Sequence, residues 1–310
     1  MVLYGYTIGD EDINPSQGGE QVTVYRFPIS PLATTPQRVG EINAGSILNA
    51  DLEGLGTNPT TQRASAVNEA RGSGTTAIDP TVIRVDNVDQ PFAPATASPT
   101  RTPSDLRRFG VDSGADFNSS ALYNISGNDD TRNGTVGSSL YRITTANPGT
   151  ISLVDAFGPA TTAAQRQGTQ PTNSQFADGL AIDNLNPGST RAFASDFSTL
   201  DGDGNQLYKV DLLTGELSAP IALRTPSGQA LNADSGLAFT NSGSQRLLAL
   251  LETGAVYEIT GYQDELAASG LGLGSAGGTN GAGFATATLL GNVNLPTAGG
   301  QYEGFTIVNE

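Results

Sequence analysis

The sequence Asp234-Ser235-Gly236-Leu237-Ala238-Phe239 decides the fold, because related sequences recur along the whole chain. Each copy has an acidic residue, a glycine directly or one residue later, and a short run of mostly apolar or small residues. Residues 178–182 (Asp-Gly-Leu-Ala-Ile) are a close copy, and residues 112–117 match at four of six positions. Looser copies begin at Glu53 and Glu303.

The leading acids of these copies are evenly spaced when the chain is treated as a circle. They are Glu53, Asp112, Asp178, Asp234 and Glu303, and the steps between them are 59, 66, 56, 69 and 60 residues. A unit of about 62 residues that repeats five times without remainder indicates one repetitive domain. The abundance of Gly, Thr, Ser and Asn suits many short strands joined by loops.

Every unit also contains a similar third strand. The pattern apolar-Tyr-charged-apolar occurs at residues 24–27, 140–143, 207–210 and 256–259, and residues 82–85 (Val-Ile-Arg-Val) take its place in the second unit. Tyrosine can bury its ring while its hydroxyl stays hydrated, so these side chains are expected to pack between neighbouring sheets. Four strands per unit, with the acid–Gly strand nearest a central axis, are typical of a propeller blade.

The two ends of the chain predict how the circle closes. Three strands precede the first acid–Gly start, at residues 2–8, 21–27 and 37–42, and residues 303–308 supply a fourth. Pairing of the two ends in one sheet would remove a frayed edge. The sequence therefore predicts an all-β fold, a five-bladed β-propeller closed by the C-terminal strand pairing with the N-terminal strands. The predicted blades of this single domain are residues 303–310 plus 1–50, 51–111, 112–176, 177–232 and 233–301.

Two stretches interrupt the regular pattern. Residues 91–105 contain four prolines, which cannot donate to a ladder, so we expect a loop on the outer rim, with an outer strand at residues 105–109. Residues 267–283 are dominated by Gly, Ala and Ser and cannot build a packed core, which predicts a loop or a contact arm.

Several of these segments resemble a class of bacterial β-propeller repeats with Leu-Tyr-Arg-Val-Asp…Thr-Gly strands and Asp-Gly-Leu-Ala-Phe starts. The resemblance is carried by residues 207–211 (Leu-Tyr-Lys-Val-Asp), 214–215 (Thr-Gly), 178–182 and 235–239. The Glu-Gly starts are more distantly similar to the propellers described as esterase-like phytases. That resemblance implies acidic calcium clusters and basic phosphate ligands at a channel mouth. This chain has only 15 Lys and Arg residues, and none gathers near the acid–Gly starts.

Composition excludes several kinds of function. A net charge of −16 and a pI of about 4.2 disfavour nucleic acids and anionic membranes, and favour cations or a basic protein partner. The absence of Cys and His removes thiolate chemistry, the Ser–His triad and imidazole ligands. We find no apolar run of about 18 residues that would predict a membrane span. Residues 1–20 contain four acids and no Lys or Arg, unlike a secretory signal, so a mature product, a cytoplasmic protein and another export route stay open.

Two sets of oxygen-bearing side chains are candidate metal sites. If each acid–Gly pair begins an inner strand, Glu53, Asp112, Asp178, Asp234 and Glu303 converge near one end of the axis and offer the ligands that Ca²⁺ requires. The alternative is local, because an acid at a tight turn accepts backbone N–H groups. The loop residues Asp201, Asp203 and Asn205 alternate with glycines and could wrap Ca²⁺, or form a turn before the next strand.

Two functions fit these observations. The first is a non-enzymatic structural or binding propeller, extracellular or surface-associated, that assembles with copies of itself or binds a basic protein. The alternative is a calcium-dependent hydrolase of the lactonase or phosphoesterase type that uses the axial carboxylates. The sequence favours the first, because it supplies no histidine base and no basic cluster, and it assigns no catalytic residue.

Overall fold

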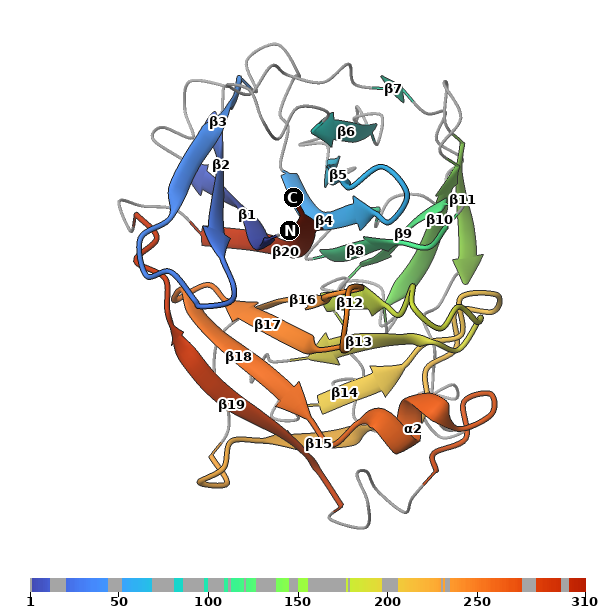
Figure 1. Ribbon diagram of the computed structural model, residues 1–310. Coiled ribbons are helices and arrows are strands. Elements are labelled where there is room, and N and C mark those ends of the chain that lie inside the picture. Colours follow the sequence, from blue (N-terminus) through green and yellow to red (C-terminus); the bar gives the residue numbers. More distant parts are fainter. Residues whose placement is uncertain are drawn as a thin grey trace, which may run out of the picture.

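In the computed structural model, strands form sheets that are arranged around a common centre (Figure 1). The structure describes residues 2–11, 21–43, 52–68, 81–85, 98–99, 109–110, 113–119, 121–126, 138–144, 150–155, 177, 179–196, 206–229, 231, 235–274, 283–296 and 301–310. Within these residues, no helix combines the length and the apolar character needed to cross a bilayer.

The first sheet contains both ends of the chain. Its order is β20 (Gln301–Asn309), β1 (Leu3–Glu11), β2 (Gln21–Pro28) and β3 (Gln37–Asn43). β1 and β20 pair antiparallel, from Leu3 opposite Asn309 to Asp10 opposite Gln301. The predicted pairing of the C-terminal strand with the N-terminal strands is therefore confirmed.

The second sheet has the order β4 (Leu52–Asn58), β5 (Arg63–Asn68), β6 (Thr81–Val85) and β7 (Ser98–Pro99). The outer strand thus lies inside the proline-rich stretch, and the expected outer strand at residues 105–109 is wrong at Phe109, which is fully buried in a turn. A proline is tolerated in β7 because an outermost strand needs to donate hydrogen bonds on one side at most.

The third sheet has the order β11 (Ile151–Asp155), β10 (Ser139–Thr144), β9 (Ala121–Ser126) and β8 (Ser113–Phe117). Its pairs are all antiparallel and its strands are consecutive, so it is a simple meander like the second sheet.

The last sheet has eight strands, made of two antiparallel meanders joined at their outer strands. The first meander is β12 (Gly179–Ile182), β13 (Ala192–Asp196), β14 (Gln206–Lys209) and β15 (Ile221–Arg224). The second is β16 (Ser235–Phe239), β17 (Leu247–Leu251), β18 (Ala255–Thr260) and β19 (Ala285–Asn292). β15 and β19 pair in parallel over two residues each.

A short helix, α2 (Gln263–Ala267), follows β18. The sequence did not predict it, since its five residues make a single turn without a capping side chain. It begins just before the Gly-rich stretch that was expected to be a loop.

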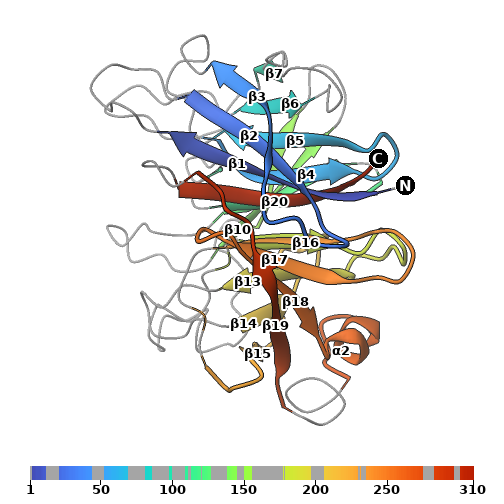
Figure 2. The same ribbon diagram turned by 60° about the vertical axis from the view of Figure 1, so that its left-hand side comes forward.

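The apolar core lies between neighbouring sheets. The inner strands contact one another in the cyclic order β20, β4, β8, β12 and β16, and Figure 1 shows them around the centre. Figure 2 shows two of them, β20 and β4, side by side from another direction. Each cluster of buried apolar residues combines side chains from two adjacent meanders. The third-strand tyrosines belong to these clusters, as predicted: they are Tyr25, Tyr141, Tyr208 and Tyr257.

Candidate functional site

The structure describes few of the predicted metal ligands. Glu53 is 4% exposed, and its Oε2 accepts a hydrogen bond of 2.7 Å from the backbone N–H of Ser113 on the neighbouring inner strand. This acid thus joins β4 to β8. The side chain of Glu303 and all of Asp112, Asp178, Asp234, Asp201, Asp203 and Asn205 lie outside the described residues, so both candidate calcium sites stay predictions.

Among the described residues, no group of three or more acidic side chains is close enough to hold a metal ion. Of the predicted ligands, only Glu53 has a described side chain, so this absence does not test the other positions.

The glycine of the acid–Gly starts has a packing role. A Cβ on Gly236 would overlap with the backbone N and the Cβ of Phe305 in the neighbouring inner strand. A Cβ on Gly304 would lie 2.9 Å from the backbone N of Leu55, and one on Gly56 would lie 2.8 Å from Cα of Asp116. Adjacent inner strands therefore approach backbone to backbone, and a side chain at these positions would separate them.

Two of these glycines also make bulges. Gly54 has φ 52° and Gly304 has φ 71°, a left-handed conformation that favours glycine. The pairing registers shift at both sites, between Glu53 and Leu55 in β4 and opposite Thr7 and Ile8 in β20. A bulge increases local twist, which inclines each inner strand as it passes the axis.

Asp116 links three inner strands near the middle of this packed region. It is 5% exposed, and its Oδ2 accepts a hydrogen bond of 2.7 Å from the N–H of Ile182 in β12. Its Oδ1 accepts from the N–H of Phe117, and the N–H of Thr57 in β4 also bonds to it. Burial raises the pKa of the Asp116 carboxyl to about 7, while the backbone N–H groups of Ile182, Phe117 and Thr57 act to lower it.

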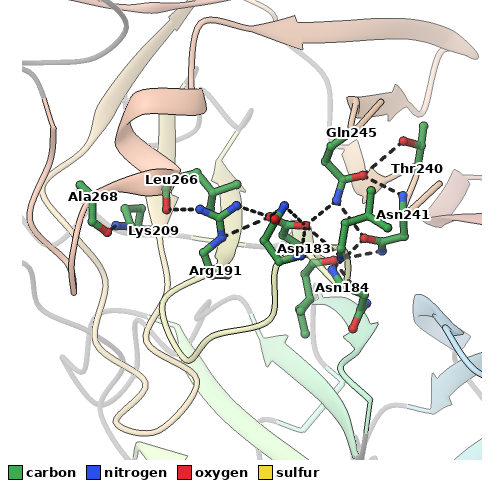
Figure 3. Close-up of polar contacts among 12 residues, drawn as sticks. Asp183, Asn184, Arg191, Lys209, Thr240, Asn241, Gln245, Leu266 and Ala268 are labelled. Carbon is green, nitrogen blue, oxygen red and sulfur yellow. Dashed lines mark hydrogen bonds and ion pairs between the residues drawn. The ribbon is translucent and has the colours of Figure 1, made fainter. Parts of the chain in front are cut away.

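The far end of the inner strands has a polar cluster centred on Asp183, which directly follows β12 (Figure 3). Its side chain is fully buried. Oδ1 accepts from the N–H groups of Leu185 and Asn186, each at 3.1 Å, and from Nε2 of Gln245 at 2.7 Å. Oδ2 forms an ion pair with Arg191. An ionised carboxylate only accepts hydrogen bonds, and this one accepts them from four residues, which joins the β12 end to the β16 end.

Amide side chains continue this polar layer around the axis. Asn184 donates its N–H to Oδ1 of Asn241, 2.8 Å away, and its Nδ2 to the carbonyl of Phe117 at 2.7 Å. Asn309, at the end of β20, donates its N–H to Oε1 of Gln62 at 2.9 Å and its Nδ2 to Ser242 Oγ at 3.3 Å. These contacts cross four junctions between inner strands, and we call this set the amide collar.

Two cations fasten α2 beside this cluster. Nη1 of Arg191 donates to the carbonyl of Leu266 at 2.9 Å, and Nζ of Lys209 donates to the carbonyls of Ala268 and Gly270 at 2.9 and 2.6 Å. Lys209 is 0% exposed. The sequence analysis missed Asp183, Arg191 and Lys209, although an Asn or Asp after each inner strand was a visible signal: these residues are Asn58, Asn118, Asp183, Asn241 and Asn309.

No protein-family model matches the chain, and no curated protein matches it. Among solved structures, one chain of a nidogen/laminin complex is similar at a TM-score of 0.47, with 11% identity over 99% of this chain and 98% of that chain. A β-propeller domain from Myceliophteria thermophila has a TM-score of 0.41, with 12% identity over 82% of this chain and 66% of its own. Regucalcin, a calcium-binding protein from Agrobacterium tumefaciens, has a TM-score of 0.32, with 12% identity over 79% and 68%. Because these TM-scores are low, the evidence for the fold is the order of the strands and not these similarities.

Proposed function

We propose that this chain is a five-bladed β-propeller that works as a non-enzymatic structural or binding module and assembles with copies of itself. The blade count follows if the eight-stranded sheet is divided at the β15–β19 pair, since the cyclic contacts then run through β20, β4, β8, β12 and β16. The proposed blade boundaries are those that the repeat predicts, with residues 303–310 completing the blade of residues 1–50.

The open edge of β19 is the observation that carries the proposal. β15 pairs with Ala285 and Thr286, and within the described residues no strand pairs with this edge at residues 287–290. Leu289 and Leu290 are 49% and 37% exposed there. The whole strand, Ala-Thr-Ala-Thr-Leu-Leu-Gly-Asn, carries no charge. Natural proteins usually protect an edge strand with charged residues or proline, and β19 has neither.

The occupant that fits this edge is the same strand of a second copy. β19 already accepts an outer strand within the chain, since β15 lies alongside its first residues. In an antiparallel strand, alternate residues turn their N–H and C=O groups away from their partner, so β19 offers further groups to an added strand. A two-fold pairing would place the exposed leucines of both copies in one contact. The net charge of −16 on each copy opposes association, so added salt should favour it.

The buried ionisable side chains support a non-enzymatic role. Asp116 and Asp183 accept hydrogen bonds that join inner strands, and Lys209 holds the segment after α2. Each group thus has a structural task. We place the module outside the cytoplasm or at a cell surface, and fractionation of producing cells tests that location.

The assembly is tested by sedimentation of the whole chain over a range of concentrations at low and high salt. The unmodified protein should form dimers or larger species that increase with concentration and with salt. Leu289→Lys should be monomeric under the same conditions, because it places a charge on the open edge. Leu213→Lys is the matched control, since Leu213 is 74% exposed in a turn away from β19 and should assemble normally. A monomeric wild type, or equal assembly of both variants, would reject this proposal.

A calcium-dependent hydrolase would behave differently in the same preparation. Ca²⁺ should then raise the melting temperature, a chelator should reverse the rise, and lactones or phosphoesters should be hydrolysed only with the ion present. The non-enzymatic proposal expects assembly to be insensitive to the chelator.

A further inference from the structure

The segment from residue 263 to residue 274, which we call the strap, belongs to the β16–β19 meander but is fastened by the β12–β15 meander. It comprises α2 and the following turns. Both ends of the strap make apolar contacts and its middle does not. Leu266 is buried in the apolar cluster between the two meanders and Leu273 packs against it partly buried, whereas Ser269, Gly270 and Gly272 are exposed. Burial of apolar surface therefore holds the two ends of the strap and contributes little at residues 268–272.

The exposed middle of the strap accepts hydrogen bonds from the side chain of Lys209. Nζ of Lys209, on β14, donates to the carbonyls of Ala268, Gly270 and Gly272 at 2.9, 2.6 and 3.4 Å (Figure 3 shows the first of these contacts). An ammonium has three donors, so these three carbonyls match its full capacity. The last carbonyls of a helix lack partners and attract cations, and Arg191 binds the carbonyl of Leu266 one turn earlier.

One further cation and two acids lie near Lys209, so the positive and negative charges of this group balance. Arg191 is a second cation, ion-paired with Asp183, and Glu265 on α2 is a fully buried acid. Tyr262 is also buried next to this group. Burial lowers the pKa of Lys209 from its ordinary value, Arg191 lowers it further, and Glu265 opposes the change. A buried ammonium is costly unless its donors are satisfied, so the lysine and the strap depend on each other.

We propose that Lys209 is the latch of a conformational strap: residues 268–272 close over the β14 side of the molecule through the lysine ammonium, and they open locally, with the propeller still folded, when that ammonium is withdrawn. The opening leaves Leu266 and Tyr262 anchored in the core. The device is thus a local unlatching and not a first step of global unfolding.

Hydrogen exchange of Lys209→Met tests the latch, because methionine keeps an apolar stem and removes the charge and the donors. Amides of residues 268–272 should exchange at least tenfold faster than in the unmodified chain, while amides of β16, β17 and β18 stay within twofold. Unchanged strap exchange, or a rise of equal size in the strap and in these strands, would overturn the proposal.

Chemical rescue separates a latch from a damaged core. In Lys209→Ala, n-propylammonium supplies the lost carbons and the ammonium, and it should restore most of the strap's protection. Tetramethylammonium is the matched control, because it has the same charge without an N–H donor and should restore none. Equal effects of the two cations, including no effect of either, would contradict a latch made by donated hydrogen bonds.

The unmodified protein gives a third measurement if the variants fail to fold. NMR of the Lys209 side chain reports its titration as the pH rises, and the backbone amides of residues 268–272 should change with the same midpoint. The neighbouring Tyr262, Arg191, Glu265 and Asp183 must be followed in the same titration, since all four face this cluster. Strap signals that stay constant while Lys209 loses its proton would reject the proposal.

Discussion

The two ends of the inner strands are held together by opposite means. At the acid–Gly end, Gly236, Gly304 and Gly54 let neighbouring backbones approach closely, so contact depends on the absence of side chains. At the far end, the amide collar and Asp183 join the strands through polar side chains. The acid–Gly end is therefore held by close packing of backbones, and the far end is held by hydrogen bonds and one buried ion pair.

This difference predicts different sensitivity to substitution. The glycine end contains several equivalent close contacts, and a Cβ at any of them meets backbone atoms that cannot move aside easily. In the collar, most side chains make one or two hydrogen bonds, each worth about 1 kcal/mol. Asp183 is the exception, because it gathers several donors in a buried position.

The largest effect is expected for Asp183→Ala. It removes the carboxylate that pairs with the Arg191 guanidinium and accepts from Nε2 of Gln245, and loss of one partner of a buried ion pair costs about 3–5 kcal/mol. The measurement is the free energy of unfolding in urea. Asn58→Ala is the matched control, since Asn58 follows β4 as Asp183 follows β12, and its Oδ1 accepts from the N–H groups of Thr60 and Thr61. The control should lose about 1 kcal/mol.

Equal losses in the two variants would mean that the collar is uniform and that Asp183 has no special weight. A larger loss for Asn58→Ala would reverse the comparison.

The next effect is expected for Gly236→Ala at the other end. The added methyl group would meet the backbone of Phe305, and forcing β16 and β20 apart should cost about 3 kcal/mol. Gly228→Ala is the control, because no atom lies within 4 Å of a Cβ there, and its φ of 78°, which Gly236 does not share, adds a backbone strain of about 1 kcal/mol. Urea unfolding of both variants measures the difference. If Gly236→Ala loses no more stability than Gly228→Ala, the close approach of the inner strands is not a stabilising feature.

Much of the fold could be predicted from the sequence because its signals are local and repeated. The acid–Gly starts and the third-strand pattern each lie within six residues, and five copies at regular spacing gave the pairing of β1 with β20. The Asp183 cluster could not be predicted in this way. Its partner Gln245 is 62 positions away, and the choice of partner depends on how β12 and β16 are packed.

The helix α2 and the outer strand β7 were missed for a related reason. α2 is too short for its own periodicity to be visible, and it is held by Lys209 and Arg191 from another meander. β7 consists of two residues, one of them a proline, and local sequence preferences argue against a strand there. In both cases tertiary contacts outweigh local preference.

A smaller effect, about 2 kcal/mol, is expected between pH 5 and pH 8 from Asp116, which lies between the two ends. Its carboxyl has an ordinary pKa of 3.8 and a folded pKa of about 7, raised by burial, so the folded protein binds this proton more tightly than the unfolded chain. The stabilising contribution is fully present below about pH 4 and is lost as the pH rises through 7. Urea unfolding of the unmodified chain should therefore show a loss of stability over this range beyond the loss in Asp116→Asn, which cannot titrate.

The control for this pH dependence is Asp211→Asn, because Asp211 is a half-buried acid in a turn, where its Oδ1 accepts from the N–H of Leu213. It removes one negative charge from the total of −16 without touching the inner strands, so its stability should follow the same pH curve as the unmodified chain. If the Asp116→Asn curve is also parallel to that of the unmodified chain, the three backbone donors outweigh burial and keep Asp116 ionised throughout. The middle of the inner strands would then resemble the collar, where hydrogen bonds to a carboxylate join the strands, more than the glycine end.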